Sequence, residues 1–130
     1  MFFIQFRYLS FFLVLVSILS FFNIIYSYYL NLYLNIETYY YSFFISLIIS
    51  ILFYKIKITE KKQNIFNKIL TVFTGYLILP IILSIPFYLS IYNLTFLNSY
   101  FEATSGFTST GFTIFENIKN IDQSLILWRS

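Results

Sequence analysis

Long apolar runs separated by short polar segments make up most of this chain. No charged residue occurs between Arg7 and Glu37, and Phe, Leu, Ile and Val dominate the run Tyr8–Leu30. A membrane-spanning helix needs about 20 apolar residues, so this run is long enough to cross with some tilt. A cleaved signal peptide is the alternative, but its apolar core is only about 7–15 residues long and ends at small residues. We therefore expect an uncleaved first span.

Two further apolar runs follow. Thr38–Tyr54 is near the lower limit of spanning length, and Ile69–Tyr92 is a longer run that contains Pro80 and Pro86. Proline removes a helix hydrogen bond and clashes with the preceding turn, so we expect a structural kink in this third helix. The pattern predicts an all-α membrane protein in which residues 1–62 form a hairpin of two transmembrane helices.

Basic residues fall on one side of the predicted hairpin. Arg7 precedes the first run, Lys55 follows the second and Lys68 precedes the third, whereas the loop between the first two runs carries only Glu37. The same basic segment also contains Lys57, Lys61 and Lys62. Lys and Arg are enriched in cytoplasmic loops. We therefore expect a cytoplasmic N-terminus and a basic cytoplasmic loop that can contact membrane lipid.

Composition supports the membrane class and narrows the chemistry. Apolar residues make up 59% of the chain and charged residues 10%, whereas soluble domains carry about 25% charged residues. Cys and His are both absent from the sequence, so thiol catalysis and a His base or metal ligand are excluded from these residues. Glu102, Glu116 and Asp122 lack the spacing of a metal or acid–base site. We expect no enzymatic activity, no cofactor and no nucleic-acid partner.

The segment Tyr100–Phe115 breaks the apolar pattern. It reads YFEATSGFTSTGFTIF, and its single acid is Glu102. Unpaired backbone groups are costly in lipid, so non-helical chain is tolerated there where it lines a cavity or is buried in protein. The preceding run Ser99–Ser105 is too short to span a membrane, and Asn98 or Ser99 can cap its start. These features predict a short re-entrant half-helix.

The residues after this half-helix predict an extended loop. Gly106 can end the helix in a left-handed conformation, residues 108–113 return as extended chain, and Ser124–Ser130 begins a further helix. Carbonyls of such a loop can replace the water shell of a cation, and Gly111 permits a torsion closed to larger residues. A simple helix break, or a small-residue packing site between helices, is the alternative. The residue pattern alone leaves both interpretations open.

Two motifs in this region resemble the Trk/Ktr superfamily of potassium transporters, most closely the TrkH-type membrane subunit. Residues 101–113 read FEATSGFTSTGFT and residues 125–130 read LILWRS. The family reads approximately FEAxSGxTTTGxT and then LLLWRS, in the same order and at a similar spacing. Ser109 replaces a commoner Thr, and Phe112 stands where small residues are frequent. Both changes leave the backbone carbonyls in place.

The resemblance implies potassium uptake through a selectivity filter built from backbone carbonyls. The implied filter residues are Thr108, Ser109, Thr110, Gly111, Phe112 and Thr113, with potassium bound by the carbonyls of Thr110, Gly111 and Phe112. The implied supporting residues are Glu102, Thr104, Ser105 and Gly106. We expect Glu102 to accept hydrogen bonds from filter N–H groups rather than to contact the ion. Arg129 is expected near the outer mouth, paired with an acid or a lipid headgroup.

The family builds one pore from four such units, whereas this sequence holds one. Residues 63–130 are expected to form its outer helix, its pore half-helix with filter loop, and a following helix that is truncated. We therefore expect an N-terminal fragment that does not conduct alone, in a multi-pass bacterial inner membrane protein. The implied partners are the remaining repeats, a cytoplasmic nucleotide-binding regulatory subunit and a homodimer mate. The alternative is a small non-transport membrane scaffold or lipid-interacting protein.

Overall fold

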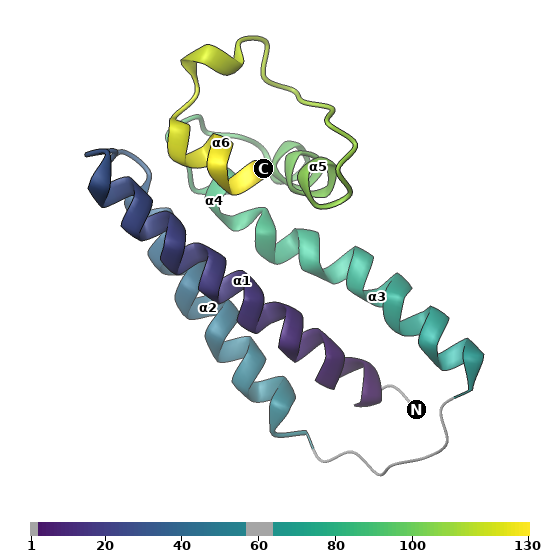
Figure 1. Cartoon of the computed structure of the whole chain (residues 1–130). Coiled ribbons are helices and arrows are strands. Elements are labelled where there is room, and N and C mark those ends of the chain that lie inside the picture. Colours follow the sequence, from purple (N-terminus) through teal and green to yellow (C-terminus); the bar gives the residue numbers. More distant parts are fainter. Residues whose placement is uncertain (1–2, 57–63) are drawn as a thin grey trace.

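The computed structural model describes residues 3–56 and 64–130, and in these ranges the secondary structure is helical, without strands (Figure 1). The elements are α1 (Phe3–Tyr29), α2 (Ile36–Tyr54), α3 (Ile65–Leu83), α4 (Ile85–Tyr88), α5 (Phe96–Phe107), η1 (Ile118–Asn120) and α6 (Gln123–Arg129). Helices α1 and α2 form a long hairpin. Helix α3 runs beside it, from the end of the molecule that holds the N-terminus to the short helices. The short elements α4, α5, η1 and α6 gather at the end of the molecule opposite the N-terminus.

Three helical stretches in the described residues are long and apolar enough to cross a membrane. They are Arg7–Tyr29, Ile36–Tyr54 and Ile65–Tyr88. The first two agree closely with the predicted runs, but the third was predicted at Ile69–Tyr92 and begins and ends earlier. Its first turn includes Asn67 and Lys68, because helical hydrogen bonds continue beyond the apolar run. The lysines at 57, 61 and 62, and the predicted boundary after residue 62, lie outside the described residues.

The seam between α1 and α2 is built from small polar side chains. The buried polar residues are Ser10, Ser17, Ser20, Asn23 and Ser27 on α1, and Thr38, Ser42, Ser46 and Ser50 on α2. Small residues let two helix backbones approach closely in a membrane. The Ser50 hydroxyl crosses the seam to donate to the Ser10 carbonyl at 2.9 Å. Large apolar side chains such as Phe11 and Phe22 face outward, as expected for a hairpin surrounded by lipid.

The third apolar stretch is interrupted at Ser84, between α3 and α4. Pro80 lies inside α3, and Pro86 lies in the first turn of α4, where it has no N–H to continue the helix. The Ser84 hydroxyl donates to the Ile81 carbonyl at 2.6 Å. The predicted kink is therefore present, as a break between two helical segments.

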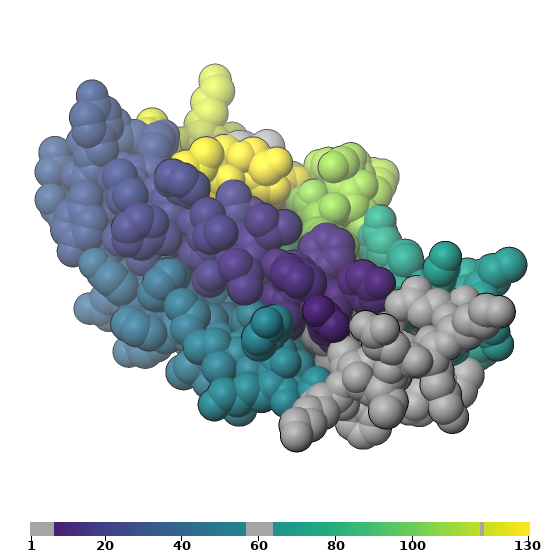
Figure 2. Space-filling view, turned by 60° about the horizontal axis from the view of Figure 1, so that its bottom comes forward, coloured from purple at the N-terminus to yellow at the C-terminus, as the bar shows by residue number. Residues whose placement is uncertain are grey.

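Two apolar clusters join the hairpin to the rest of the chain. One contains Leu9, Leu13, Val16, Leu79 and Ile82, between α1 and α3. The other contains Ile24, Tyr39, Phe87, Ala103 and Leu125, and it brings together α1, α2, α4, α5 and α6. Figure 2 shows α6 against α1 and beside α5. The short helices thus rest on the half of the hairpin that is remote from the N-terminus.

Candidate functional site

Helix α5 carries the predicted loop at its C-terminal end. It is capped by Thr95, whose hydroxyl accepts from the Asn98 N–H at 3.3 Å, so the predicted caps at Asn98 and Ser99 were wrong. The hydroxyl of Ser99 instead donates to the Thr95 carbonyl at 3.0 Å. The helix therefore begins a turn earlier than its polar composition indicated, because Phe96 and Leu97 occupy its first turn.

The end of α5 also differs from the prediction. Gly106 lies inside the last turn, and Ser109 is the residue that takes the left-handed conformation, with φ 56°. Ser109 N donates to the Gly106 carbonyl at 3.0 Å, and Thr110 N donates to the Ser105 carbonyl at 3.1 Å. This pair of bonds is a Schellman motif. Gly106 serves a different purpose, because a Cβ atom there would lie 2.6 Å from the Arg129 carbonyl oxygen.

Hydroxyl groups hold the first half of the loop against α5. Thr108 Oγ1 donates to the Thr104 carbonyl at 2.7 Å. Ser105 Oγ donates to the Phe112 carbonyl at 2.5 Å and lies 3.2 Å from Thr110 Oγ1. Gly111 follows with φ 79° and no atom within 4 Å of an added Cβ, so its torsion rather than crowding requires glycine. Thr104 and Ser105 thus brace the loop from the helix.

Glu102 holds the second half of the loop. Its side chain is fully buried, and its Oε1 accepts from Thr113 Oγ1 at 2.7 Å and from the Ile114 N–H at 2.6 Å. Its Oε2 lies 3.1 Å from Arg129 Nε, an ion pair whose atoms are not aligned for a hydrogen bond. A buried carboxylate is costly unless it is paired and hydrogen-bonded. Glu102 has both kinds of partner, one from the loop and one from α6.

Arg129 bridges this carboxylate and the loop carbonyls. Its Nη2 donates to the Gly111 carbonyl at 3.1 Å and to the Phe112 carbonyl at 2.7 Å. The Phe112 oxygen also accepts from Ser105, so both of its lone pairs are used. Gly111 keeps one lone pair, and no donor among the described residues bonds to the Thr110 carbonyl. Of the three carbonyls predicted to bind potassium, that of Phe112 is therefore the least available.

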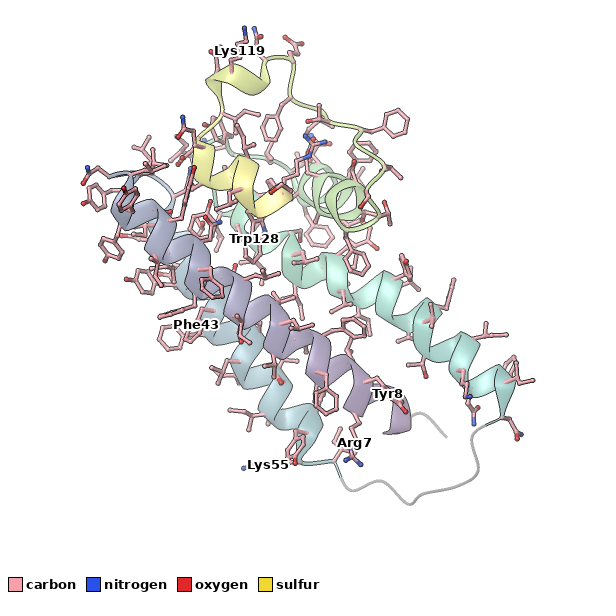
Figure 3. All side chains as sticks on the ribbon, viewed as in Figure 1. Arg7, Tyr8, Phe43, Lys55, Lys119 and Trp128 are labelled. Atoms are coloured by element: carbon pink, nitrogen blue, oxygen red, sulfur yellow. The ribbon has the colours of Figure 1, made fainter. Side chains whose placement is uncertain are left out.

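Helix α6 is positioned by three residues that no sequence motif marked and by Trp128 of the LILWRS motif. Asn23, Asn35 and Tyr39 contact its start, and Trp128 near its end donates from Nε1 to the Leu83 carbonyl at 3.0 Å. Figure 3 shows Trp128 where α6 meets the break between α3 and α4. Asn23 and Asn35 carried a sequence signal, because each is an asparagine inside or beside an apolar run, whereas Tyr39 carried none. Buried polar groups in membranes are expensive and commonly have a partner.

The site offers oxygen atoms from backbone and hydroxyl groups rather than a cluster of metal-binding side chains. Among residues 3–56 and 64–130, no group of three His, Cys, Asp or Glu could hold a metal ion. Carbonyl and hydroxyl oxygens suit ions that are bound weakly enough to leave again. Oxygens of this kind line the loop, and they can contact a cation reversibly.

Fold and site together define a helical membrane protein with a Thr/Gly loop tied to a buried acid. The chain is similar to an uncharacterized cation transporter, MJ1485, of Methanocaldococcus jannaschii, with 28% identity over 102 residues. This match covers 77% of the present chain and 22% of the transporter, so the chain spans less than a quarter of that relative. No family model and no solved structure matches the chain. The similarity concerns a cation transporter as a class and does not specify the Trk/Ktr superfamily.

Proposed function

We propose that this chain forms part of a pathway for monovalent cations, with potassium as the favoured ion, across a cell membrane. The supporting observation is that the loop after α5 presents backbone oxygens to positive charge. The carbonyls of Gly111 and Phe112 both accept from the Arg129 guanidinium. The similarity to a cation transporter and the membrane-length helices support the same assignment. In this proposal the chain is a passive conduit and carries out no covalent chemistry.

We assign ion contact to the carbonyls of Thr110 and Gly111. Both keep acceptor capacity among the described residues, whereas the Phe112 oxygen is saturated. Glu102 and Ser105 shape the loop and do not touch the ion. One loop supplies only part of the oxygen shell that replaces an ion's water. The other oxygens would come from further repeats of a complete transporter, as the resemblance to the potassium transporters implies.

Charge distribution supports an orientation for this pathway. Arg7 and Lys55 lie at one end of the α1–α2 hairpin, and Lys119 lies at the opposite end of the molecule (Figure 3). Because Lys and Arg flanking membrane spans are enriched on the cytoplasmic side, we assign the Arg7 end to the cytoplasm. The loop after α5 then faces the outside of an inner, or plasma, membrane. Ions would enter the pathway from that side.

Rubidium uptake tests this proposal in a chimera. The chain replaces the matching part of the M. jannaschii transporter, in cells that lack their own potassium uptake. Gly111→Ala forces a larger residue into a left-handed torsion at a cost of about 1–2 kcal/mol, so we expect selectivity for rubidium over sodium to fall. Gly75→Ala is the matched control, because Gly75 lies in α3 with no atom within 4 Å of an added Cβ.

Two results would count against the proposal. A membrane-inserted chimera without rubidium uptake above that of empty cells would favour a non-transport scaffold. Unchanged selectivity in Gly111→Ala would remove the loop from the ion pathway. The control separates these results from a loss of folding: an equal fall in uptake in Gly111→Ala and Gly75→Ala would assign the effect to general destabilisation and not to the loop.

A further inference from the structure

We propose that the α1–α2 hairpin positions the Thr/Gly loop, acting through α6. Three polar side chains of the hairpin form hydrogen bonds to the start of α6. The last turn of α6 carries the arginine that binds the loop. Asn23, Asn35 and Tyr39 are thus positioning residues that do not touch the ion. The link to ion selectivity rests on the proposed function, whereas the mechanical link between hairpin and loop does not.

Most of these hydrogen bonds involve Ser124, which is fully buried. Its hydroxyl accepts from the Tyr39 hydroxyl at 2.8 Å, and its carbonyl accepts from Asn23 Nδ2 at 3.0 Å. Its N–H donates to Asp122 Oδ1 at 3.1 Å, which caps α6. Two of the three bonds therefore come from the hairpin, one from α1 and one from α2. Together they fix both the position and the rotation of the first turn.

Asn35 adds a second point of attachment. Its Nδ2 donates to Asp122 Oδ2 at 2.9 Å, and its Oδ1 accepts from the Ile91 N–H at 3.1 Å. One oxygen of the Asp122 carboxylate thus caps α6 while the other is held by the hairpin. Asn35 is almost fully buried, so these bonds are shielded from competing water. The chain after α4 and the start of α6 are tied to the same side chain.

The C-terminal end of α6 connects these fixed contacts to the loop. Helix α6 is only about 10 Å long, so a shift of its first turn is carried to its last turn. The Trp128 ring lies 5.9 Å from the Tyr39 ring, and its neighbour Arg129 binds the loop carbonyls. Close contact with Gly106 leaves no room between α5 and α6 at this point. A displacement of α6 at Ser124 must therefore move the guanidinium relative to the loop.

The hydrogen bonds between the hairpin and α6 determine the orientation of α6 more than they stabilise the fold. Hydrogen bonds between membrane helices contribute only about 0.6–2 kcal/mol each, and apolar side chains would also fill these positions. A purely apolar contact, however, permits sliding and rotation that a directional bond to Ser124 does not. The arrangement therefore suits a device that sets the orientation of a short helix.

Hydrogen exchange in the full 130-residue chain, held in lipid nanodiscs, tests the link without any ion. Tyr39→Phe removes only the hydroxyl that binds Ser124 and keeps the ring beside Trp128. We expect amides of residues 108–115 to exchange about threefold to tenfold faster, because this factor corresponds to the loss of one hydrogen bond. Tyr40→Phe is the matched control, because the Tyr40 hydroxyl lies 3.0 Å from an exposed Tyr28 hydroxyl. It should leave loop exchange unchanged.

A spectroscopic signature accompanies this measurement. Trp128 is the only tryptophan in the sequence, so its emission reports on the end of α6 and on its contacts with Tyr39 and Leu83. We expect Tyr39→Phe, but not Tyr40→Phe, to shift this emission and increase its quenching by acrylamide. A Tyr39→Phe chain with unaltered Trp128 emission and loop exchange would overturn the proposal.

A double variant guards against a trivial loss of folding. Tyr39→Phe and Ser124→Ala remove the two ends of one bond, so the double variant should accelerate loop exchange no more than either single variant. Additive acceleration would show that the two residues act separately and would also overturn the proposal. If the loop responds as expected while the chimera fails to take up rubidium, the positioning link stands and the transport proposal fails.

Discussion

The α1–α2 hairpin and the loop after α5 use the same side chains for opposite purposes. In the hairpin, the hydroxyls of Ser17, Ser20 and Ser46 return to carbonyls of their own helix, as Ser20 does to Val16 at 3.0 Å. Around the loop, the hydroxyl of Ser105 in the last turn of α5 reaches the Phe112 carbonyl, and the hydroxyl of Thr113 in the loop reaches the Glu102 carboxylate. Along the hairpin, Ser and Thr mainly permit close packing of two helices. Around the loop, they determine the shape of the chain.

The largest difference between the two regions should appear at the buried acid. Glu102→Gln leaves Arg129 without its countercharge. Breaking a fully buried ion pair costs about 3–5 kcal/mol, and we expect the lower end of this range because Arg129 is partly exposed and keeps its carbonyl bonds. We expect this loss in the free energy of unfolding, measured by denaturant titration in mixed micelles. Glu116→Gln is the control, because Glu116 is exposed and should be close to neutral. Equal effects of the two substitutions would remove Glu102 from the centre of the site.

Glycine substitution gives the next largest contrast. In Gly106→Ala the new Cβ would meet the Arg129 carbonyl oxygen at 2.6 Å, and such overpacking costs about 1–3 kcal/mol. Gly75→Ala meets nothing within 4 Å and removes a poor helix former, so it should be neutral or stabilising. Thermal unfolding of the two variants, followed by circular dichroism, checks the difference. A Gly106→Ala chain as stable as Gly75→Ala would contradict the close approach of α5 and α6.

One identical substitution in each region tests the comparison directly. Ser105→Ala loses the bond to the Phe112 carbonyl, so we expect a loss of about 1 kcal/mol. Ser42→Ala removes a buried hydroxyl that has no hydrogen-bond partner, so it should be neutral or slightly stabilising. The free energies of unfolding of both variants decide the matter. A larger loss for Ser42→Ala would mean that the hairpin seam depends on its hydroxyls as much as the loop does.

The smallest expected effect is at the end of α5. Ser109 has a left-handed φ of 56°, which glycine adopts without strain. Ser109→Gly should stabilise the chain by about 0.5 kcal/mol, after the greater entropy of glycine in the unfolded chain is subtracted. Ser99→Gly, inside the same helix, should instead destabilise it. Melting temperatures of the pair measure both signs, and destabilisation by Ser109→Gly would contradict the helix ending described above.

Sequence reasoning succeeded where the physical signal is local. The length of an apolar run determines whether a helix can span a membrane, so α1 and α2 were predicted within a few residues. Pro80 and Pro86 similarly marked the interruption of the third stretch. Gly111 was expected to use a torsion closed to larger residues, and its φ of 79° confirms this expectation.

Sequence reasoning failed where the decisive contact is distant along the chain or depends on backbone geometry. Asn23 binds Ser124 across 101 positions of the chain, and neither residue carries a local sign of its partner. Thr95 was missed because Asn98 and Ser99 are also good N-cap residues. Ser109 was missed because glycine is the preferred residue at the left-handed end of a helix. The Arg129 bond to the Phe112 carbonyl was missed because a side-chain pattern does not reveal which oxygens are already occupied.

The pairing of Glu102 with Arg129 also constrains how the molecule is made. Synthesis proceeds from the N-terminus, so the acid leaves the ribosome before the arginine that neutralises it. An uncompensated carboxylate is strongly disfavoured inside a bilayer, and α5 should therefore wait at the membrane surface until α6 has emerged. We expect the Thr/Gly loop to assemble late in biosynthesis, on a hairpin that has already inserted. The order of synthesis thereby makes the scaffold first and the loop last.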